Sequence, residues 1–272
     1  MGKVIVAAGI LTLTTDFGTE GPYVAAMKGV VLGLAPGTQI VDVSHAITPQ
    51  DIAEGSFVLA GIVPYFPVGT VHLAVVDPSV GTDRRLIAAE VDGNWFVLPD
   101  NGLIGGVLRG RDPSGVWEIR NPKLRRASVS PTFHGRDILA PAAAHLLNGG
   151  PAADLGPPLD ALVLPSELEP AEDEAGLTGE VVFLDSFGNL ITNIPRDRLG
   201  TTPPSGWSAE ILGIDAGRLI RAYGERPPGE LVALIGSSDR VEIAVVNGDA
   251  ARRLAAGRGT PVRVRRLREG LS

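Results

Sequence analysis

Cysteine is absent from all 272 residues of the sequence, which excludes disulfide bonds and thiolate metal sites. This composition fits a reducing cytoplasm, where we expect the protein to be. Apolar runs of the roughly 20 residues needed to cross a membrane are also missing, so we expect a soluble protein. Positive charge is scarce: the formal net charge is −7, whereas binding to nucleic acid needs a basic surface. Neither a nucleic acid nor a membrane is therefore expected as a partner.

The N-terminal apolar run that follows Lys3 superficially resembles a short signal peptide. No small-residue cleavage pattern comes after it, and it continues directly into Asp16. Gly2 is not a myristoylation site either, because Val6 stands where Ser or Thr is required. We interpret the run as the first buried strand.

What is present is enough for a well-filled core, since 44 % of the residues are hydrophobic and only 20 % are charged. The first ~150 residues alternate strand-like and helix-like segments, the pattern of an α/β layer fold. Thr48 is expected to cap one of the helices. The predicted strands are 11–15, 39–43 and 71–76, a hairpin joins 86–91 to 95–98 through Asp92-Gly93, and the predicted helices are 23–34, 51–65 and 136–147.

Prolines and acidic residues accumulate after Pro151, and we interpret 156–176 as a linker between two domains, 1–155 and 177–272. The second domain shows short strand-like runs with turn signals and no long helical pattern, which predicts a small β-barrel or sandwich. Its expected strands are 181–184, 209–214, 231–235, 241–246 and 261–264. The expected fold is therefore an α/β domain with a central, mostly parallel sheet, followed by a smaller β-barrel.

Asp16 lies where the first predicted strand ends, and ligands of open α/β sheets bind beyond the carboxyl ends of strands. A carboxylate there can accept two hydrogen bonds from a ribose diol. The alternative is an N-cap for the helix 23–34, which is the favoured interpretation when Asp16 is considered alone. No G-x-G-x-x-G pattern follows a strand, so a pyrophosphate cradle is not indicated.

The strand 71–76 delivers Asp77 into a turn, and Arg84 and Arg85 emerge on its other side. Asp77 and Arg84 are close enough in sequence for a salt bridge across the turn. Such pairs are common for structural reasons alone. By itself the pair is either a clasp or part of a substrate site.

His134 stands just before the predicted helix 136–147, where a lone histidine is more often a structural donor than a catalytic group. Gly135 after it permits close approach of the backbone to a ligand. The other histidines are expected to be structural: His45 and His72 as satisfied core residues, and His145 inside a helix.

Three further segments are turn-like. Residues 99–102 are expected to form a turn in which Asp100 or Asn101 caps a helix. Residues 185–189 form a hairpin turn, or they present an aromatic ring and an amide to a base. Residues 236–239 are again turn-like, with hydroxyls that can bind a carboxylate.

Together these motifs closely resemble one family. The resemblance rests, in chain order, on TLTTDFG, YVAAMKG, DVSH with ITPQD, VDPSVGTDRR, PDNG, TFHGRD and FGNLITNI. They look like the S-adenosylmethionine (SAM) hydrolases, or SAM hydroxide adenosyltransferases, whose superfamily also contains fluorinase and chlorinase. The resemblance runs from about Leu11 to Asn247. It implies an α/β domain, a C-terminal β-barrel, and a homotrimer whose active sites lie between subunits.

The resemblance also implies how SAM is bound. Asp16 matches the carboxylate that holds the ribose hydroxyls, Phe187 and Asn189 match the adenine-contacting pair, and Ser237 matches a contact to the methionine end. The family usually has an acid at Gly21 that helps to bind the methionine ammonium. Here either Glu20 serves from one residue earlier, or this contact is weaker.

Asp77, Arg84 and His134 match the triad that marks the hydrolase branch. In the halogenases the first and last of these positions are typically tyrosines and the middle one is not arginine. Gln50, counted among the substrate-binding positions, agrees with a hydrolase, since fluorinase has a tryptophan there. The chain thus looks like a hydrolase, not a halogenase.

The implied reaction converts SAM and water into adenosine and L-methionine. The sulfonium makes C5′ of the ribose electrophilic, so catalysis needs mainly a water placed in line with the C–S bond. Arg84 would supply positive charge near the oxygen, His134 or Asp77 would relay the proton, and an orienting role is favoured for Asp77. No cofactor or metal is expected. A halide-dependent SAM halogenase and a non-catalytic SAM or adenosine binder are the alternatives.

Overall fold

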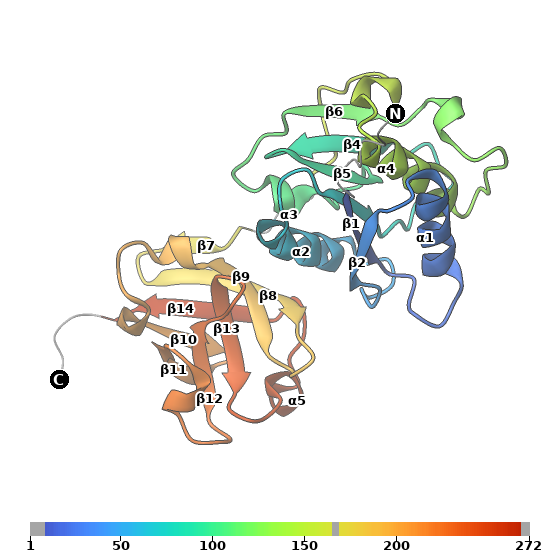
Figure 1. Cartoon of the computed structure of the whole chain (residues 1–272). Coiled ribbons are helices and arrows are strands. Elements are labelled where there is room, and N and C mark those ends of the chain that lie inside the picture. The colour runs from blue at the N-terminus through green and yellow to red at the C-terminus, as the bar shows by residue number, and fades with distance from the viewer. Residues whose placement is uncertain (1–8, 165–168, 268–272) are drawn as a thin grey trace. The chain divides into compact units, whose positions relative to one another are not determined.

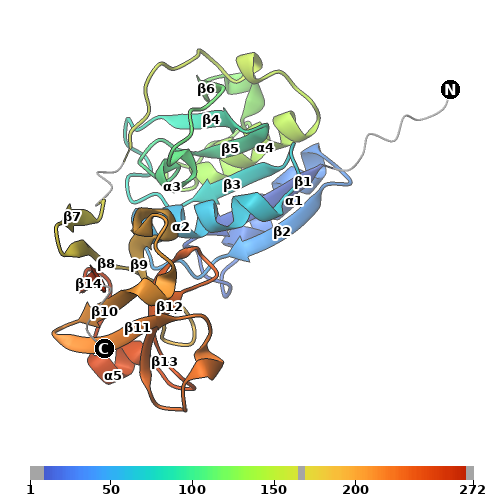
Figure 2. The same cartoon turned by 90° about the vertical axis from the view of Figure 1, so that its left-hand side faces the viewer.

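The computed structural model describes residues 9–164 and 169–267. The chain divides into two compact units, Met1–Ser166 and Glu167–Ser272 (Figures 1 and 2). Each unit has a hydrophobic core of its own. Lys3, Gly2 and Val6, on which the expectations for the N-terminus rest, lie outside the described residues. So do residues 165–168 of the expected linker.

Within the described residues, the first unit contains a six-stranded sheet of order β2-β1-β3-β5-β4-β6. The strands β2, β1, β3 and β5 are mutually parallel, whereas β4 runs antiparallel to β5 and β6. The expected α/β domain with a mostly parallel sheet is confirmed. The strands are β1 (Ile10–Thr15), β2 (Gln39–Ser44), β3 (Val71–Val75), β4 (Leu86–Val91), β5 (Asn94–Pro99) and β6 (Gly115–Glu118).

Helices cover both faces of this sheet (Figure 1). Successive side chains of a strand point to opposite faces, and in these strands the side chains on both faces are largely apolar, so both faces need a cover. One face packs on α1 (Tyr23–Leu34) and α4 (Ala140–Leu147), and the other packs on α2 (Ile52–Ile62) and α3 (Gly105–Leu108). Shorter turns of helix are η1 (Val63–Tyr65), η2 (Pro122–Leu124) and η4 (Ala152–Asp154), and a π-helical segment, η3 (Gly135–Leu139), leads into α4.

Several local predictions for the first unit are confirmed and two need correction. The Asp92-Gly93 turn joins β4 and β5, with both residues at positive φ as a tight hairpin turn requires. Thr48 does not cap α2. The cap is Asp51, whose carboxylate accepts a hydrogen bond from the Glu54 amide at 2.9 Å. Asp16 does not cap α1 either, since Pro22 is the residue at the start of that helix.

The second unit is a closed β-barrel, as expected. Within the described residues its strand order is β14-β10-β11-β12-β13-β9-β8-β7, and pairing of β14 with β8 closes the ring, with β7 added beside β8. The strands are β7 (Ala171–Asp173), β8 (Gly176–Leu184), β9 (Leu190–Pro195), β10 (Trp207–Ile211), β11 (Ile214–Ile220), β12 (Leu231–Ile235), β13 (Arg240–Val245) and β14 (Pro261–Arg266). The helical segments are η5 (Arg196–Leu199), η6 (Pro204–Gly206), η7 (Tyr223–Glu225) and α5 (Ala250–Leu254).

The predicted strand 209–214 is wrong as one element, because a turn divides it. Leu212 and Gly213 both have positive φ, so the chain reverses between β10 and β11. The strands β9 and β11 were not predicted. β7 and the first residue of β8 lie inside the span 156–176.

Candidate active site

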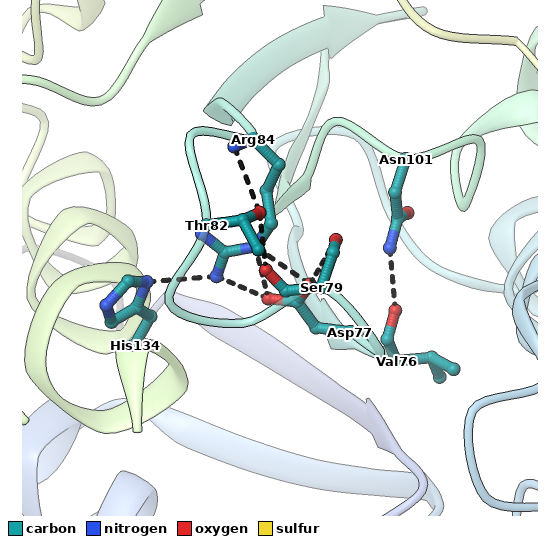
Figure 3. A network of polar contacts seen from close by, with 7 residues as sticks. All are labelled: Val76, Asp77, Ser79, Thr82, Arg84, Asn101 and His134. Carbon is teal, nitrogen blue, oxygen red and sulfur yellow. Dashed lines mark hydrogen bonds and ion pairs between the residues drawn. The ribbon is translucent and has the colours of Figure 1, made fainter. Parts of the chain in front are cut away.

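The end of β3 carries a buried ion pair. Asp77 follows Val76 at the end of the strand, and the turn from Pro78 to Gly81 returns the chain to β4. Arg84 Nε donates to both carboxylate oxygens of Asp77 at 2.8 Å, and Arg84 Nη2 donates to Oδ2 (Figure 3). The two side chains are only 5 % and 7 % exposed. Because two of its nitrogens donate to the carboxylate, the plane of the Arg84 guanidinium is fixed relative to Asp77. The carboxylate also balances the buried positive charge.

His134 joins this pair from a segment far along the chain. Arg84 Nη2 lies 2.9 Å from His134 Nδ1 (Figure 3). Since a guanidinium only donates, Nδ1 must be the acceptor and the proton of the neutral ring is on Nε2. Burial and the nearby charge of Arg84 lower the pKa of His134 below its ordinary value. Asp77, Arg84 and His134, which were expected to act together, thus form one cluster. The lowered pKa favours the neutral imidazole, whose Nε2 carries the N–H donor.

The loop that holds the ion pair is braced by neighbouring polar groups. Ser79 Oγ donates to Asp77 Oδ1 at 3.3 Å, and the Arg84 amide donates to Thr82 Oγ1 at 3.4 Å (Figure 3). Asn101 Nδ2 donates to the Val76 carbonyl at 2.9 Å. Asn101 therefore fixes the strand end from which Asp77 projects, a role that its turn-like sequence did not reveal.

Arg85, the next residue, has a separate structural partner. Its Nε donates to Asp100 Oδ2 at 2.8 Å, and its Nη2 donates to the Ala161 carbonyl at 3.0 Å. Asp100 Oδ1 also accepts from the Val163 amide at 2.8 Å. Neither Asp100 nor Asn101 caps a helix, because α3 begins after Ile104 without a side-chain cap. Arg85 and Asp100 instead tie residues 161–163 to the sheet.

Asp16 follows β1, at the carboxyl edge of the same sheet. Its Oδ2 accepts a hydrogen bond from the Gln50 amide at 2.8 Å. Gln50 has a φ of 68°, a left-handed conformation that is strained for residues other than glycine. The Gln50 backbone thus orients Asp16, while its side chain is exposed. Glu20 and Gly21 are also exposed, in the loop before α1.

The turn that carries Asp16 rests on a hydrogen-bonded histidine. His45 Nδ1 is hydrogen-bonded to Thr15 Oγ1 at 2.8 Å and His45 Nε2 to Asp42 Oδ1 at 3.0 Å, and Lys28 pairs with Asp42. Both ring nitrogens of His45 are therefore satisfied, as expected. The apolar strand context of His45 predicted only a core residue, whereas its motif DVSH was the signal for its role next to Asp16.

The other two histidines differ in how well they are satisfied. His72 Nδ1 is hydrogen-bonded to Thr12 Oγ1 at 2.8 Å, but its Nε2 is buried without a partner among the described residues. The expectation of a satisfied core histidine is wrong for this second nitrogen. Burial lowers the pKa of His72 to about 4. His145 Nε2 is hydrogen-bonded to the Pro151 carbonyl at 3.0 Å and closes the end of α4, which fits a structural role.

The residues expected to contact adenine and methionine belong to turns of the barrel. Asp185 Oδ1 accepts from the amides of Phe187 and Asn189, both at 2.9 Å, and Asp185 Oδ2 accepts from Asn189 Nδ2 at 2.9 Å. This network leaves Asn189 buried and Phe187 with 74 % of its surface exposed. Ser237 is exposed in the turn between β12 and β13. A large aromatic ring held out from an ordered turn is a ready stacking surface.

One buried carboxyl of the barrel was missed by the sequence analysis. Glu242 on β13 is 5 % exposed and accepts a hydrogen bond from the Tyr223 hydroxyl. Burial, together with the charge of Asp185, raises the pKa of Glu242, and burial beside Glu242 raises the pKa of Tyr223. The signal in the sequence was a glutamate, Glu242, inside the otherwise apolar predicted strand 241–246.

In residues 9–164 and 169–267, no group of three or more His, Cys, Asp or Glu side chains is arranged to hold a metal ion. In the same ranges, no helix is both long enough and apolar enough to span a membrane.

The chain thus combines an α/β domain, a β-barrel domain and an Asp77–Arg84–His134 cluster. Comparison with known families identifies the class of protein that has these two domains. The SAM hydroxide adenosyltransferase N-terminal domain matches residues 11–156, and the C-terminal domain of the same name matches residues 179–263. The chain belongs to the SAM hydroxide adenosyltransferase family, so the resemblance inferred from the motifs is confirmed.

Named relatives agree with this assignment. The chain is 41 % identical to an (R)-S-adenosyl-L-methionine hydrolase of Thermus thermophilus over 92 % of this chain and 97 % of the relative. A hydrolase of the same name from Salinispora arenicola is also 41 % identical, over 93 % and 97 %. A fluorinase of an Actinoplanes species is more distant, at 32 % identity over 70 % and 73 %. Among solved structures, an uncharacterized conserved protein from Thermotoga maritima superposes with a TM-score of 0.87 and 34 % identity, covering 94 % of this chain and 100 % of that one.

Proposed function

We propose that this protein hydrolyses SAM to adenosine and L-methionine. The observation that carries the proposal is the buried Arg84 guanidinium, held by Asp77 on one side and hydrogen-bonded to His134 on the other. In the reaction, a water oxygen forms a bond to C5′ of the ribose while the C–S bond breaks. The electron pair of that bond goes to the sulfonium sulfur, which becomes the neutral thioether of methionine, and one water proton is released.

The triad acts by placing the water and favouring its hydroxide character. Arg84 supplies fixed positive charge, and the Nε2–H of His134 supplies a neutral donor; both stabilise the negative charge of a bound hydroxide before it attacks C5′. Asp77 acts by orienting Arg84 and not as a base, because N–H groups of Arg84 already donate to both of the Asp77 oxygens. His134 Nδ1 is likewise occupied. The arrangement therefore favours binding of hydroxide over proton removal by a side-chain base, a proximity and charge effect.

Substrate binding is assigned from the matched positions. Asp16, oriented by the Gln50 amide, accepts the ribose hydroxyls. Phe187 stacks on adenine, Asn189 contacts its edge, and Ser237 contacts the methionine end. Glu20 serves the methionine ammonium in place of the missing acid at Gly21, and Gly135 allows the substrate to approach the backbone.

The assembly proposed is a cytoplasmic homotrimer with active sites between subunits, as the family resemblance implies. Exposed apolar side chains of the first unit are consistent with an interface. Tyr23, Leu32 and Leu34 of α1 and Val41 of the edge strand β2 are large apolar residues with exposed side chains. Exposed apolar residues on an edge strand and on a neighbouring helix are common at subunit contacts. Light scattering of the purified protein measures the subunit number directly.

Product analysis tests the function. The protein is incubated with SAM, with and without a large excess of chloride or fluoride, and the nucleosides are separated by chromatography. Adenosine and methionine are expected in equal amounts under all conditions. A 5′-halogenated nucleoside that appears with halide would identify a halogenase, and unchanged SAM with bound nucleoside would identify a non-catalytic binder.

A further inference from the structure

The turn that carries Arg84 touches the loop that carries His134 at a point where only glycine fits. Gly81 has a φ of 85°, and a Cβ built on it would lie 2.9 Å from the Pro131 carbonyl oxygen. That is closer than a Cβ normally approaches any heavy atom, and the neighbour is a backbone atom that cannot rotate away. The close approach of these two backbones is thus built into the sequence at one position.

The Pro131 side of this contact is anchored by a buried carboxylate. Asp137 is fully buried, and its Oδ2 accepts a hydrogen bond from the Ser130 amide at 2.8 Å. Arg136 donates to the same carboxylate through Nε at 2.6 Å and Nη2 at 2.7 Å, and Arg126 Nε lies 3.2 Å from Oδ1. Asp137 therefore connects both ends of the segment 126–136 to one point inside the domain.

His134 lies close to this anchor in the sequence and contacts Arg84 on the other loop. It is the first residue before the π-helical segment η3, within which Asp137 also lies. The Asp137 amide donates to the Phe133 carbonyl at 3.1 Å, and a Cβ added at Gly135 would lie 3.3 Å from Met27 Sδ. π-Helical insertions are often found at functional sites, where they change the direction in which a side chain points. The backbone on both sides of His134 is thus fixed.

We propose that Gly81 and Asp137 are positioning residues for the hydrolysis: Gly81 lets the two loops approach, Asp137 anchors the loop of His134, and together they set the Arg84–His134 contact. The inference rests on the water-handling role proposed for Arg84 and His134. Neither Gly81 nor Asp137 needs to touch SAM, and each acts through the geometry of its loop.

The environment of His134 provides a readout that does not depend on activity. The charged groups that act on its ring are Arg84 and Arg125, which lower its pKa, and Asp77 and Asp137, which raise it. Burial also lowers the pKa. When the two loops move apart, the ring loses burial and its contact with Arg84, so its pKa should rise towards the ordinary value.

The experiment uses two variants and a matched control for each. Gly81→Ala introduces the clash, and Gly69→Ala is its control, because Gly69 has a φ of 91° and no atom within 4 Å of an added Cβ. Asp137→Asn removes the anchoring charge. Its control is Asp100→Asn, another buried carboxylate that accepts from an arginine and from a backbone amide. For each full-length variant, kcat and KM are measured with SAM, and the His134 midpoint is measured by NMR titration of histidine-labelled protein.

In Gly81→Ala and Asp137→Asn we expect kcat to fall between about tenfold and a hundredfold with little change in KM, because small displacements of reacting groups are costly. In Gly81→Ala, which leaves every charge in place, the His134 midpoint should rise. In Asp137→Asn the lost carboxylate by itself lowers the midpoint, so the readout there is the chemical shift of the His134 ring at neutral pH, which should change when the contact with Arg84 is lost. The controls should change none of these values. A midpoint that stays in place in folded Gly81→Ala, or a ring signal that stays in place in folded Asp137→Asn, overturns the inference, whatever happens to activity. A midpoint that rises without loss of kcat keeps the geometric role and refutes the catalytic role proposed for the triad. If one variant does not fold, the other decides the question.

Discussion

Arg84 Nη2 donates to His134 Nδ1 at 2.9 Å while Arg84 Nε donates to both oxygens of Asp77. One buried arginine therefore fixes the tautomer of the histidine and holds the aspartate in one orientation. Each of the three side chains depends on the other two for its charge or its geometry. Changes at Arg84 should thus disturb the site more than changes at a neighbouring arginine.

Arg84→Ala should lower kcat by roughly a hundredfold to a thousandfold, since it removes the charge that favours hydroxide at the position of the attacking water. Binding of SAM, measured by calorimetry, should change far less. The matched control is Arg85→Ala, which removes an arginine paired with buried Asp100 but not with His134. Equal losses of turnover and SAM affinity in Arg84→Ala would instead indicate a binding role.

Asp77→Asn should destabilise the fold by about 3–5 kcal/mol, because it leaves the buried Arg84 without a counter-charge. The double variant with Arg84→Gln should recover most of this loss, since both charges are then gone. Denaturant unfolding measures the free energies. Ser79→Ala, which removes only a 3.3 Å contact to Asp77, serves as the control. Simple addition of the two single effects would show that the pair is not coupled.

The pH dependence of turnover should report His134. Burial and Arg84 lower its pKa from the ordinary 6.5, so the ring stays neutral, and Nδ1 stays an acceptor, as the pH falls through 6.5. Protonation at lower pH removes that acceptor, so the acid limb of kcat/KM should lie below pH 6.5. In His134→Asn this limb should disappear from the lower activity that remains. An acid limb above pH 6.5 in the unmodified protein would contradict the arrangement.

Stability in acid should depend on His72. Its pKa is about 4 in the fold and about 6.5 when unfolded, so between these values the unfolded state binds more protons. Stability is therefore complete above pH 6.5 and falls as the pH drops towards 4, by about 3 kcal/mol at about 1.4 kcal/mol per pKa unit. Denaturant unfolding across this range measures the loss. His72→Asn, which does not titrate there, should remove this part of the pH dependence; an unchanged slope would assign it to other groups.

Phe187→Ala should weaken SAM binding by roughly tenfold to a hundredfold, as loss of a base-stacking ring does elsewhere. Its effect on thermal stability should be small, because the ring is 74 % exposed. Leu212→Ala is a matched control, since Leu212 is also a large exposed side chain at a turn of the barrel. Unchanged SAM affinity in Phe187→Ala would remove Phe187 from the adenine site.

The elements with strong local signals were predictable from the sequence. The buried strand β3 and the Asp-Gly hairpin of β4 and β5 have patterns that fit one structure. The strands β9 and β11 gave weaker signals, because β9 contains Asn193 and ends in Pro195, and β11 contains Gly217 at a φ of 78°. Such residues disfavour strands locally, and pairing within the closed barrel overrides that preference.

The sequence identified which residues belong to the candidate site, but most of the contacts between them could not be predicted from it. The salt bridge of Asp77 and Arg84 follows from their spacing across one turn. The approach of His134 depends instead on the path of a loop, which Pro131, Asp137 and the π-helical segment determine together. Likewise, the Asp16 contact with the Gln50 amide requires a left-handed residue that sequence patterns do not reveal.

The pairing of β14 with both β10 and β8 closes the barrel with the strand that is synthesised last among those described. The edges of β10 and β8 therefore stay unpaired until β14 has left the ribosome. During that interval they are open to pairing with other chains, which is how edge strands aggregate. The first unit can fold earlier, since domains generally fold as units in the order of synthesis. Pairing of residues 261–266 with both neighbours is thus the step that covers these two edges.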